Sequence, residues 1–386
     1  MITANHLAFR ELWRNRGRFL LFSLVIALIT VLVLFIAALG EGLGAGNREY
    51  LEKLDADLIV YQEAARLSIA ASRIERDTLR SIRNIEGVKA AGPIGFASAA
   101  IPIEEGRELF DISLIGVEPK LPGNPPIIEG QSLFRRTGDQ IVIDETVAMI
   151  TKAQVGDWLT LRSIQGSNIE FHELEVVGIC ESRKYSIRPS VFAPYVTWAR
   201  IRPKALVGGG EDDLSCHIVA LQLEDPVQSE TVRELLRTKI GDLEAVDHVT
   251  AYENTPGYAE QQSTLATQNT FALLIGILVI GGFFQIQTLQ KVGQIGMLKA
   301  IGTPNRTIAV AIILQILTIT LLGVLIGSLA TWALSLSFPP NIPIVFEWRS
   351  GIMAIATIIA IGPLGGLVSI RYALSVEPLV ALGLSS

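Results

Sequence analysis

The chain is poor in the residues and motifs that most enzymes and soluble domains depend on. Of its 386 residues only 18% are charged, and it has two cysteines and four histidines. No Cys-x-x-Cys pair occurs and the histidines lack metal-ligand spacing, so we expect no bound metal. Neither G-x-x-x-x-G-K-[ST] nor G-x-S-x-G occurs, so we expect no P-loop, no other bound cofactor and no catalytic residue.

Single residues that could do chemistry have plainer interpretations. Carboxylates such as Asp144 and Glu145 are interpreted as solvated or helix-capping groups. The cysteines Cys180 and Cys216 lie in separate strand-like runs, and the sequence leaves open whether they form a disulfide.

Apolar sequence is in excess, at 49% of residues, and it gathers in four runs. Each run is near the ~20 residues with which a helix crosses a bilayer. The runs are 19–39, 270–289, 308–336 and 352–370. None contains a charged residue or histidine, whereas an ion-coupled carrier usually needs an intramembrane charge. A cleaved signal peptide is the alternative for the first run, but an apolar core of about 7–15 residues is typical there, so we interpret it as an uncleaved anchor.

Cations near the ends of these runs indicate their orientation. They precede the first run, fill the connection between the second and third, and follow the fourth: Arg10, Arg14, Arg16, Arg18, Lys291, Lys299, Arg306 and Arg371. Both termini and residues 290–307 are therefore predicted to be cytoplasmic, and residues 40–269 to lie outside. The outer segment has 23 Lys and Arg against 35 Asp and Glu, a net charge of 23 − 35 = −12, which argues against nucleic acid as a partner.

The outer segment predicts an α+β domain inserted between the first and second spans. Two stretches read as strand–helix–strand units. One contains DLIVY, a helix over Ile69–Arg83, and VKAAGP; the other contains HIVALQL, a helix over Val227–Ile240, and AVDHVTAY. Between them QIVID, DWLTLR and FHELEVVGI read as strands.

We divide the outer segment accordingly into two lobes and two stalks. The membrane-proximal α+β lobe covers about 55–117 and 204–253, and a β-rich inserted lobe covers about 118–203. Stalks at 40–54 and 258–269 lead to the membrane.

Residues 1–18 predict a helix in the membrane interface, with Trp13 at headgroup level and Arg10, Arg14 and Arg18 facing anionic lipid. A basic flank without a helix is the alternative. In the third span, Gly323-x-x-x-Gly327 predicts close helix approach, although such a pair also occurs as ordinary membrane glycine.

The connection 290–307 predicts a cytoplasmic elbow that continues from the second span. Apolar residues recur at a spacing of three, Gly302 is a natural helix stop, Thr303 can cap the next helix and Pro304 can open it. The elbow either lies on the membrane surface or docks into a groove of a cytoplasmic partner. The candidate contacts are Lys291, Gln294, Ile295, Met297, Leu298, Lys299, Ile301, Gly302 and Pro304.

On these residues the chain resembles the permease subunits of FtsX-like, MacB-type ABC transporters, which include macrolide-exporter, lipoprotein-releasing and DevC-type relatives. GQIGMLKAIG resembles their coupling segment, with Lys299 and Gly302 in place and Gln294 where an acid is usual. EPLVALG resembles their ending, with Pro378, Ala381 and Leu382 in place, and VGDWLTL resembles a strand of their outer domain.

The resemblance implies a multi-pass protein of the bacterial inner (plasma) membrane that works as a dimer of identical or related permeases. Each copy would bind a separate ABC ATPase, which holds the ATP and magnesium, and some systems add a membrane-fusion or adaptor protein. ATPase closure would move the elbows, and the stalks would pass this motion to outer domains that act on substrate at the outer leaflet. A membrane-anchored sensor and a membrane-bound hydrolase are the alternatives, and the sequence does not name a substrate.

Overall fold

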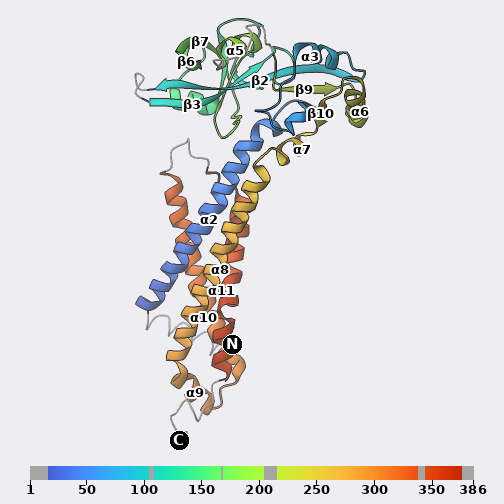
Figure 1. Cartoon of the computed structure of the whole chain (residues 1–386). Helices are drawn as coiled ribbons and strands as arrows, with labels where there is room; N and C mark the ends of the chain where they lie inside the picture. Colours follow the sequence, from blue (N-terminus) through green and yellow to red (C-terminus); the bar gives the residue numbers. More distant parts are fainter. Residues whose placement is uncertain (1–15, 104–107, 167, 204–214, 338–343, 376–386) are drawn as a thin grey trace. The chain divides into compact units, whose positions relative to one another are not determined.

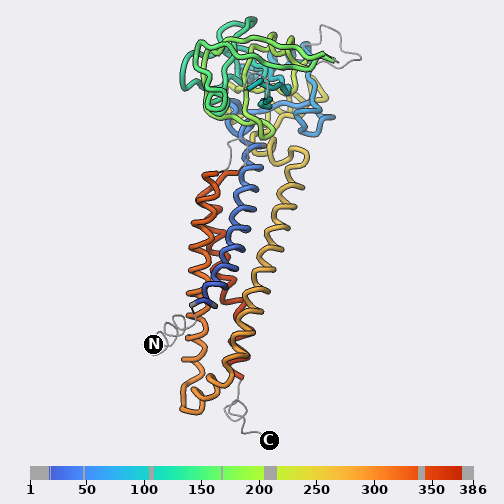
Figure 2. Tube along the Cα trace, turned by 90° about the vertical axis from the view of Figure 1, so that its left-hand side faces the viewer, coloured from blue at the N-terminus to red at the C-terminus, as the bar shows by residue number. Residues whose placement is uncertain are grey.

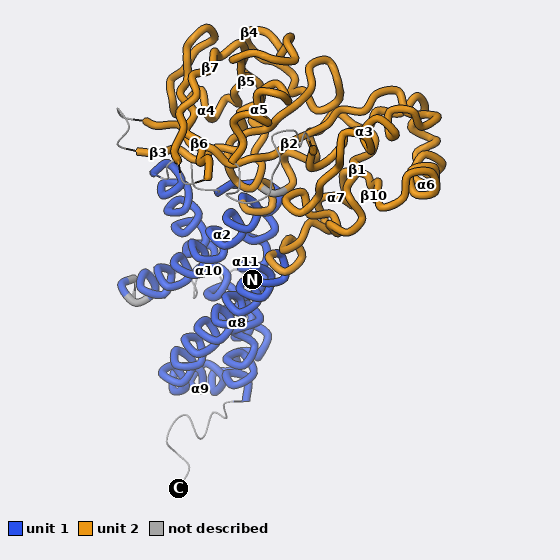
Figure 3. The backbone as a smooth tube through the Cα atoms, turned by 45° about the horizontal axis from the view of Figure 1, so that its top comes forward, with its two compact units in different colours: residues 1–42, 262–386 blue, residues 43–261 orange. Residues whose placement is uncertain are grey.

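The computed structural model describes residues 16–103, 108–166, 168–203, 215–337 and 344–375. The chain forms two compact units, Met1–Gly42 with Gln262–Ser386, and Leu43–Gln261 (Figure 3). The predicted interfacial residues Arg10, Trp13 and Arg14, the side chain of Arg18, and the C-terminal Pro378, Ala381 and Leu382 lie outside the described residues.

The first unit is a helical bundle. In the described part of the chain, four helices are long and apolar enough to cross a membrane. Within the unit they run alongside one another (Figures 1 and 2). They are α2 (Arg16–Glu52), α8 (Tyr258–Gln290), α10 (Asn305–Ser335) and α11 (Trp348–Ser375), with the short α9 (Val292–Ala300) between α8 and α10.

Glycine lets these helices approach one another closely. A Cβ added at Gly323 or Gly327 of α10 would lie 2.6 Å from the Cβ of Ile26 or of Thr30 on α2. The close approach predicted for this glycine pair is therefore confirmed, and α2 is the partner helix. Small residues at such crossings allow backbone-to-backbone packing, which replaces the hydrophobic driving force that lipid does not supply.

The second unit is built on one sheet, which has ten strands in the part of the outer segment that the structure describes. Its path is β10-β1-β9-β2-β3-β8-β5-β7-β4, and β6 pairs with β2 and β7. The strands are β1 (Leu58–Gln62), β2 (Val88–Ile103), β3 (Glu108–Val117), β4 (Ile127–Gly130), β5 (Gln140–Asp144), β6 (Trp158–Gln165), β7 (Asn168–Cys180), β8 (Ser190–Pro194), β9 (Ile218–Leu223) and β10 (Leu243–Val246). The helices are α3 (Arg76–Arg83), α4 (Glu145–Thr151), α5 (Tyr195–Ile201), α6 (Ser229–Lys239) and α7 (His248–Glu253).

The two predicted strand–helix–strand units interleave at one end of this sheet. Strand β9 lies between β1 and β2, antiparallel to both, and β10 pairs with β1. The β-rich insertion continues the same sheet, because β8 pairs in parallel with β3. Four long apolar helices and this inserted α+β domain are the fold class that the sequence predicts.

One helix start and one strand differ from the prediction for these two strand–helix–strand units. The first helix was predicted from Ile69 but α3 begins at Arg76, because Ile74 forms a β-bridge with Cys216. The last predicted strand ends at Val246, and His248–Glu253 is the helix α7. Asp247 caps α7 by accepting a hydrogen bond from the Thr250 amide, and this cap outweighs the β-branched residues that suggested a strand.

Both cysteines are buried and carry free thiols. Burial raises the pKa of each thiol, Cys180 and Cys216, to about 12. Neutral thiols of this kind behave as small apolar side chains and react slowly.

Candidate functional site

The elbow between α8 and α10 is a separate short helix with a glycine stop. Gly302 has φ of +91°, in the left-handed region. The Thr303 amide donates to the Leu298 carbonyl and the Gly302 amide to the Lys299 carbonyl, each at 3.0 Å. These are the two bonds of a Schellman motif, so the predicted stop at Gly302 is confirmed.

Two details of the elbow differ from the sequence prediction. α8 ends at Gln290 and does not run on into the elbow, because Lys291 leaves the helical region with φ −102° and ψ 3°. α10 begins at Asn305 with Pro304 as its N-cap, so Thr303 is not the cap and Pro304 is not the first helical residue. Pro304 has the extended backbone of an N-cap, with φ −68° and ψ 145°, so the helix starts one position later than predicted.

One side of α9 holds the elbow to the rest of the helical unit. Ile295 is buried against Ile308 of α10 and Ala373 of α11. Burial of such a side chain stabilises by about 1.5–3 kcal/mol. The Lys299 ammonium donates to the Leu374 carbonyl at 2.7 Å, in the last turn of α11. A cation in this place also complements the helix dipole, so Ile295 and Lys299 fix where the elbow lies within this unit.

Two large apolar side chains are exposed at the other side of the elbow, Met297 on α9 and Ile301 at its C-cap. The side chains of Met297 and Ile301 are 55% and 77% exposed. Gln294, Gly302 and Pro304 are exposed as well. The predicted contact set therefore divides into five exposed residues, of which Met297 and Ile301 have large apolar side chains, and residues that are half-buried or buried: Lys291, Ile295, Leu298 and Lys299.

Leu298 is one of the half-buried residues. It lines a pocket of about 700 Å³, counted with its open mouth, between α8, α9 and α10. Phe284 and Gln287 of α8 and Gln315 of α10 line the same pocket. The Lys291 ammonium, also at this pocket, lies 5.8 Å from the ring centre of Phe19, within cation–π range.

The outer end of α2 is part of the core of the second unit. Tyr50, Leu51 and Leu54 are buried in its hydrophobic core. The Tyr50 ring lies edge-on to Phe96 at 5.1 Å and to Tyr185 at 6.0 Å between centroids. Aromatic pairs at such distances add to the free energy gained by burial.

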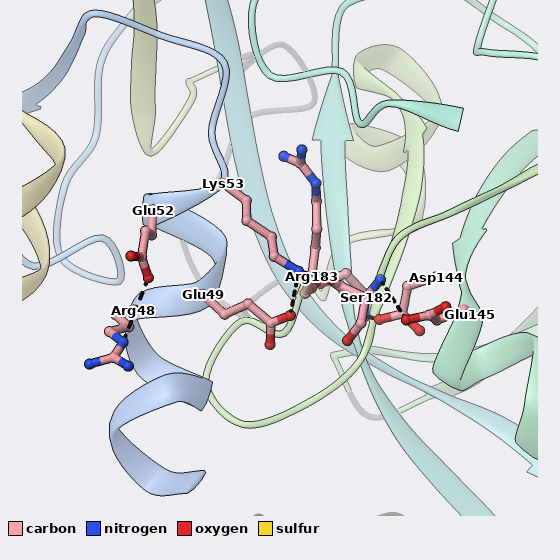
Figure 4. A network of polar contacts seen from close by, with 9 residues as sticks. Arg48, Glu49, Glu52, Lys53, Asp144, Glu145, Ser182 and Arg183 are labelled. Carbon is pink, nitrogen blue, oxygen red and sulfur yellow. Dashed lines mark hydrogen bonds and ion pairs between the residues drawn. The ribbon is translucent and has the colours of Figure 1, made fainter. Parts of the chain in front are cut away.

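A polar network extends this attachment (Figure 4). The Lys53 ammonium donates to the Glu49 carboxylate at 3.0 Å and to the Ser182 carbonyl at 2.7 Å. The Ser182 amide in turn donates to Glu145 at 3.4 Å. The segment after β7 is thereby tied both to α2 and to α4.

Asp144 lies next to Glu145 of this network, at the start of α4. Its carboxylate caps α4 by accepting from the Val147 amide at 2.8 Å, and it also accepts from the Ser190 amide at 2.7 Å. The prediction that Asp144 is a capping group is confirmed. Burial raises the pKa of this carboxyl to about 6, against the opposing effect of its backbone hydrogen bonds.

Family comparison agrees with this architecture. The MacB-like periplasmic core domain matches residues 19–239, and the FtsX-like permease C-terminal domain matches residues 269–378. The chain belongs to the MacB/FtsX-type ABC transporter permeases.

Relatives of this permease match it over nearly its whole length. The "Putative hemin transport system permease protein HrtB" of Staphylococcus haemolyticus (strain JCSC1435) is 22% identical over 98% of this chain and 99% of its own. An "Uncharacterized ABC transporter permease" of Mycobacterium tuberculosis (strain ATCC 25618 / H37Rv) is 22% identical over 96% and 97%. Among solved structures, the periplasmic region of MacB from Actinobacillus actinomycetemcomitans matches 54% of this chain and 98% of its own, with 16% identity and a TM-score of 0.38.

The elbow of the permease is marked in its sequence, whereas the burial of the end of α2 is not. Tyr50 and Lys53 carry no motif, and their partners Phe96, Tyr185 and Ser182 are distant in sequence. The one available signal was that the apolar residues Leu51 and Leu54 continue past the first span.

Proposed function

We propose that this permease couples ATP hydrolysis in a separate ABC ATPase subunit to export of, or mechanical work on, a substrate at the outer leaflet or beyond. The observation that carries the proposal is the elbow, whose Met297 and Ile301 are exposed on a helix held by Ile295 and Lys299. A rigid helix with an exposed apolar pair can transmit a push from a cytoplasmic partner to the bundle. The ATP and magnesium belong to that partner.

The assembly that follows contains two permease copies, identical or related, and an ATPase for each, in the bacterial plasma membrane with both termini in the cytoplasm. The motion of α2 would reach the outer domain through the buried Tyr50 and the network around Lys53. An adaptor protein is a further partner where export crosses a second membrane. Hemin is the first substrate to test, because the staphylococcal relatives are named for its transport.

The docking test uses the exposed apolar residues of the elbow. Ile301→Asp and Met297→Asp remove an apolar contact worth roughly 1.5–3 kcal/mol and bring a charge into the interface. We expect each to weaken ATPase binding at least tenfold, since about 1.4 kcal/mol is a factor of ten. The measurement is the affinity of the purified permease for its cognate ATPase, with membrane levels of each variant determined in parallel.

The matched control is Val227→Asp in the outer unit, where the side chain is 88% exposed and the substitution has the same chemistry. We expect it to bind the ATPase like the wild type. Normal affinity in both Ile301→Asp and Met297→Asp, at normal membrane levels, would show that the elbow is not the docking site. The permease alone should hydrolyse no ATP, and robust hydrolysis by the purified chain would contradict the division of labour.

Orientation has a separate test. A cysteine introduced at Val227 should react with a membrane-impermeant maleimide only from outside the cell. A cysteine introduced at Ile301 should react with it only from the inside. The native Cys180 and Cys216 are buried and give a low background. Labelling of Ile301→Cys in intact cells would overturn the predicted topology.

A further inference from the structure

Four arginines line one pocket of the outer unit. Arg76, Arg80 and Arg83 lie four and three positions apart on α3, which places them on one face of that helix. Arg136 faces them from the segment before β5. The pocket holds about 670 Å³, counted with its open mouth, and we call it the arginine pocket.

The arginine pocket is strongly positive in an acidic part of the chain. Among the described residues that line it, Glu118 is the single acid. Four arginines and one glutamate give 4 − 1 = +3, whereas residues 40–269 together carry −12. Such a concentration of one charge against the sign of its surroundings attracts anions.

Glu118 orders two of the arginines. Its carboxylate, whose side chain is 13% exposed, accepts from Arg83 Nη2 at 2.6 Å through one oxygen and pairs with Arg136 through the other. Arg83 is further held because its Nε donates to the Ala91 carbonyl at 3.1 Å. One carboxylate cannot use all the donors of two guanidinium groups, so part of each fork remains available to a ligand.

Arg76 and Arg80 lie at the exposed rim. Arg80 pairs with Asp77 at 2.9 Å, where both side chains are solvent-exposed and the pair contributes little. Arg76 is solvent-exposed at the first position of α3. These two side chains can turn toward an incoming anion at small cost.

Apolar groups form the rest of the wall. Leu79, Pro93 and Pro119 line the pocket together with Tyr195 and Val196 of α5. The Tyr195 ring is held by stacking on the buried Trp198, 5.3 Å away between centroids. Apolar walls lower the local dielectric and so strengthen the attraction between arginines and an anion.

We propose that the arginine pocket is a binding site for a multiply charged anionic group bearing phosphate or carboxylate oxygens. Guanidinium forks match both groups through paired N–H···O bonds. The lining charge of +3, or +2 once the Asp77 beside Arg80 is counted, suits a ligand with two or three negative charges. The site lies wholly in the outer unit and involves no residue of the elbow, so it stands independently of the ATPase proposal.

The test uses the full-length chain purified in a neutral detergent and measures binding by titration calorimetry. The probes are pyrophosphate and citrate as free anions, and dihexanoyl phosphatidic acid as a lipid headgroup with dihexanoyl phosphatidylcholine as its neutral counterpart. We expect saturable binding of at least one anionic probe, weakened by added salt, and none of the phosphatidylcholine. Tightest binding of pyrophosphate or citrate would identify a free anion, and tightest binding of the phosphatidic acid a headgroup.

Two matched double variants decide whether the pocket is responsible. Arg76→Gln with Arg80→Gln removes the two rim cations, and Arg237→Gln with Lys239→Gln removes two exposed cations from α6, giving the same change in net charge. We expect the first pair to weaken anion binding at least tenfold and the second to leave it unchanged, with melting temperatures like the wild type in both. Absence of saturable binding by all anionic probes, or an equal loss in both double variants, would overturn the proposal.

Discussion

Two helix ends attach to the outer unit, and they do so by opposite means. The end of α2 is buried there, with Tyr50 and Leu51 in the hydrophobic core. The start of α8 is largely exposed from Tyr258 onward and follows Gly257, whose φ is +89°. Its aromatic contact is Tyr258 with Tyr252, at 6.1 Å between centroids.

The difference bears on the mechanical coupling proposed above. A helix end that is packed in a core moves with that core, because interiors are close-packed and transmit strain. A helix that begins after an exposed glycine turn can change direction at low cost, because few contacts must be broken. We therefore expect α2 to carry motion to the outer domain and α8 to act as a pivot.

The largest expected effect comes from truncating the buried aromatic ring. Tyr50→Ala should destabilise the outer unit by about 3–5 kcal/mol, the range for large aromatic residues in cores. Tyr258→Ala, at the half-buried start of α8, should cost far less. Thermal unfolding of the purified chain measures both, and similar losses would remove the proposed distinction between the two helix ends.

Tyr50→Phe separates ring packing from the hydroxyl group. The Tyr50 hydroxyl is buried and has no hydrogen-bond partner among the described residues. A buried hydroxyl without a partner costs desolvation energy, so its removal should be neutral or stabilising. Tyr50→Ala therefore tests the packing of the ring, and Tyr50→Phe tests the hydroxyl group at the same position.

A pH effect of up to about 3 kcal/mol is expected from Asp144, beside the α2 attachment. Burial raises its folded-state pKa from 3.8 to about 6, and each unit corresponds to about 1.4 kcal/mol. Between pH 4 and pH 6 the folded state holds this proton more strongly than the unfolded state. Its contribution to stability is therefore greatest below about pH 4 and is lost as the pH rises through 6.

Asp144→Asn tests that contribution, because the amide does not titrate and keeps one oxygen for the Val147 or the Ser190 amide. The fall in melting temperature between pH 4 and pH 7 should be smaller in this variant than in the wild type. An unchanged pH dependence would show that another group is responsible.

A smaller effect is expected at the pivot. Gly257→Ala should cost about 1–2 kcal/mol, the penalty of a left-handed backbone for a residue with a Cβ. Beyond the two neighbouring residues, no described atom lies within 4 Å of the position that this Cβ would occupy, so backbone strain is the main cost. Gly257→Asn should cost less because asparagine tolerates this region, and equal losses in thermal unfolding would contradict the explanation.

The sequence predicts the parts of this molecule that depend on local pattern. The four spans follow from apolar runs of sufficient length, and the end of α9 follows from a glycine that accepts φ of +91° at Gly302. The strands QIVID and FHELEVVGI are marked by β-branched residues and alternation. In each case the neighbours in sequence decide the conformation.

Features that depend on distant partners could not be predicted. Lys299 belongs to the predicted contact set, but its hydrogen-bond partner, the Leu374 carbonyl, is 75 positions away. The arginine pocket combines α3 with residues near 118, 136 and 195, which only the folded sheet brings together. Tyr50 likewise gives no sign in sequence that Phe96 and Tyr185 will enclose it.

The smallest expected effect is that of the salt bridge on α2, although Figure 4 shows it in the middle of the network. Lys53 pairs with Glu49 at 3.0 Å on a partly exposed surface and also donates to the Ser182 carbonyl. Exposed pairs of this kind contribute about 0–1 kcal/mol, because water competes for both groups. Lys53→Gln should therefore lower the free energy of unfolding by at most about 1 kcal/mol, well below the effect of Tyr50→Ala. Adding 0.5 M salt to the wild type should reproduce part of that loss, since screening weakens surface pairs. A loss as large as that of Tyr50→Ala would mean that polar contacts, and not the buried ring, hold α2 in the outer unit.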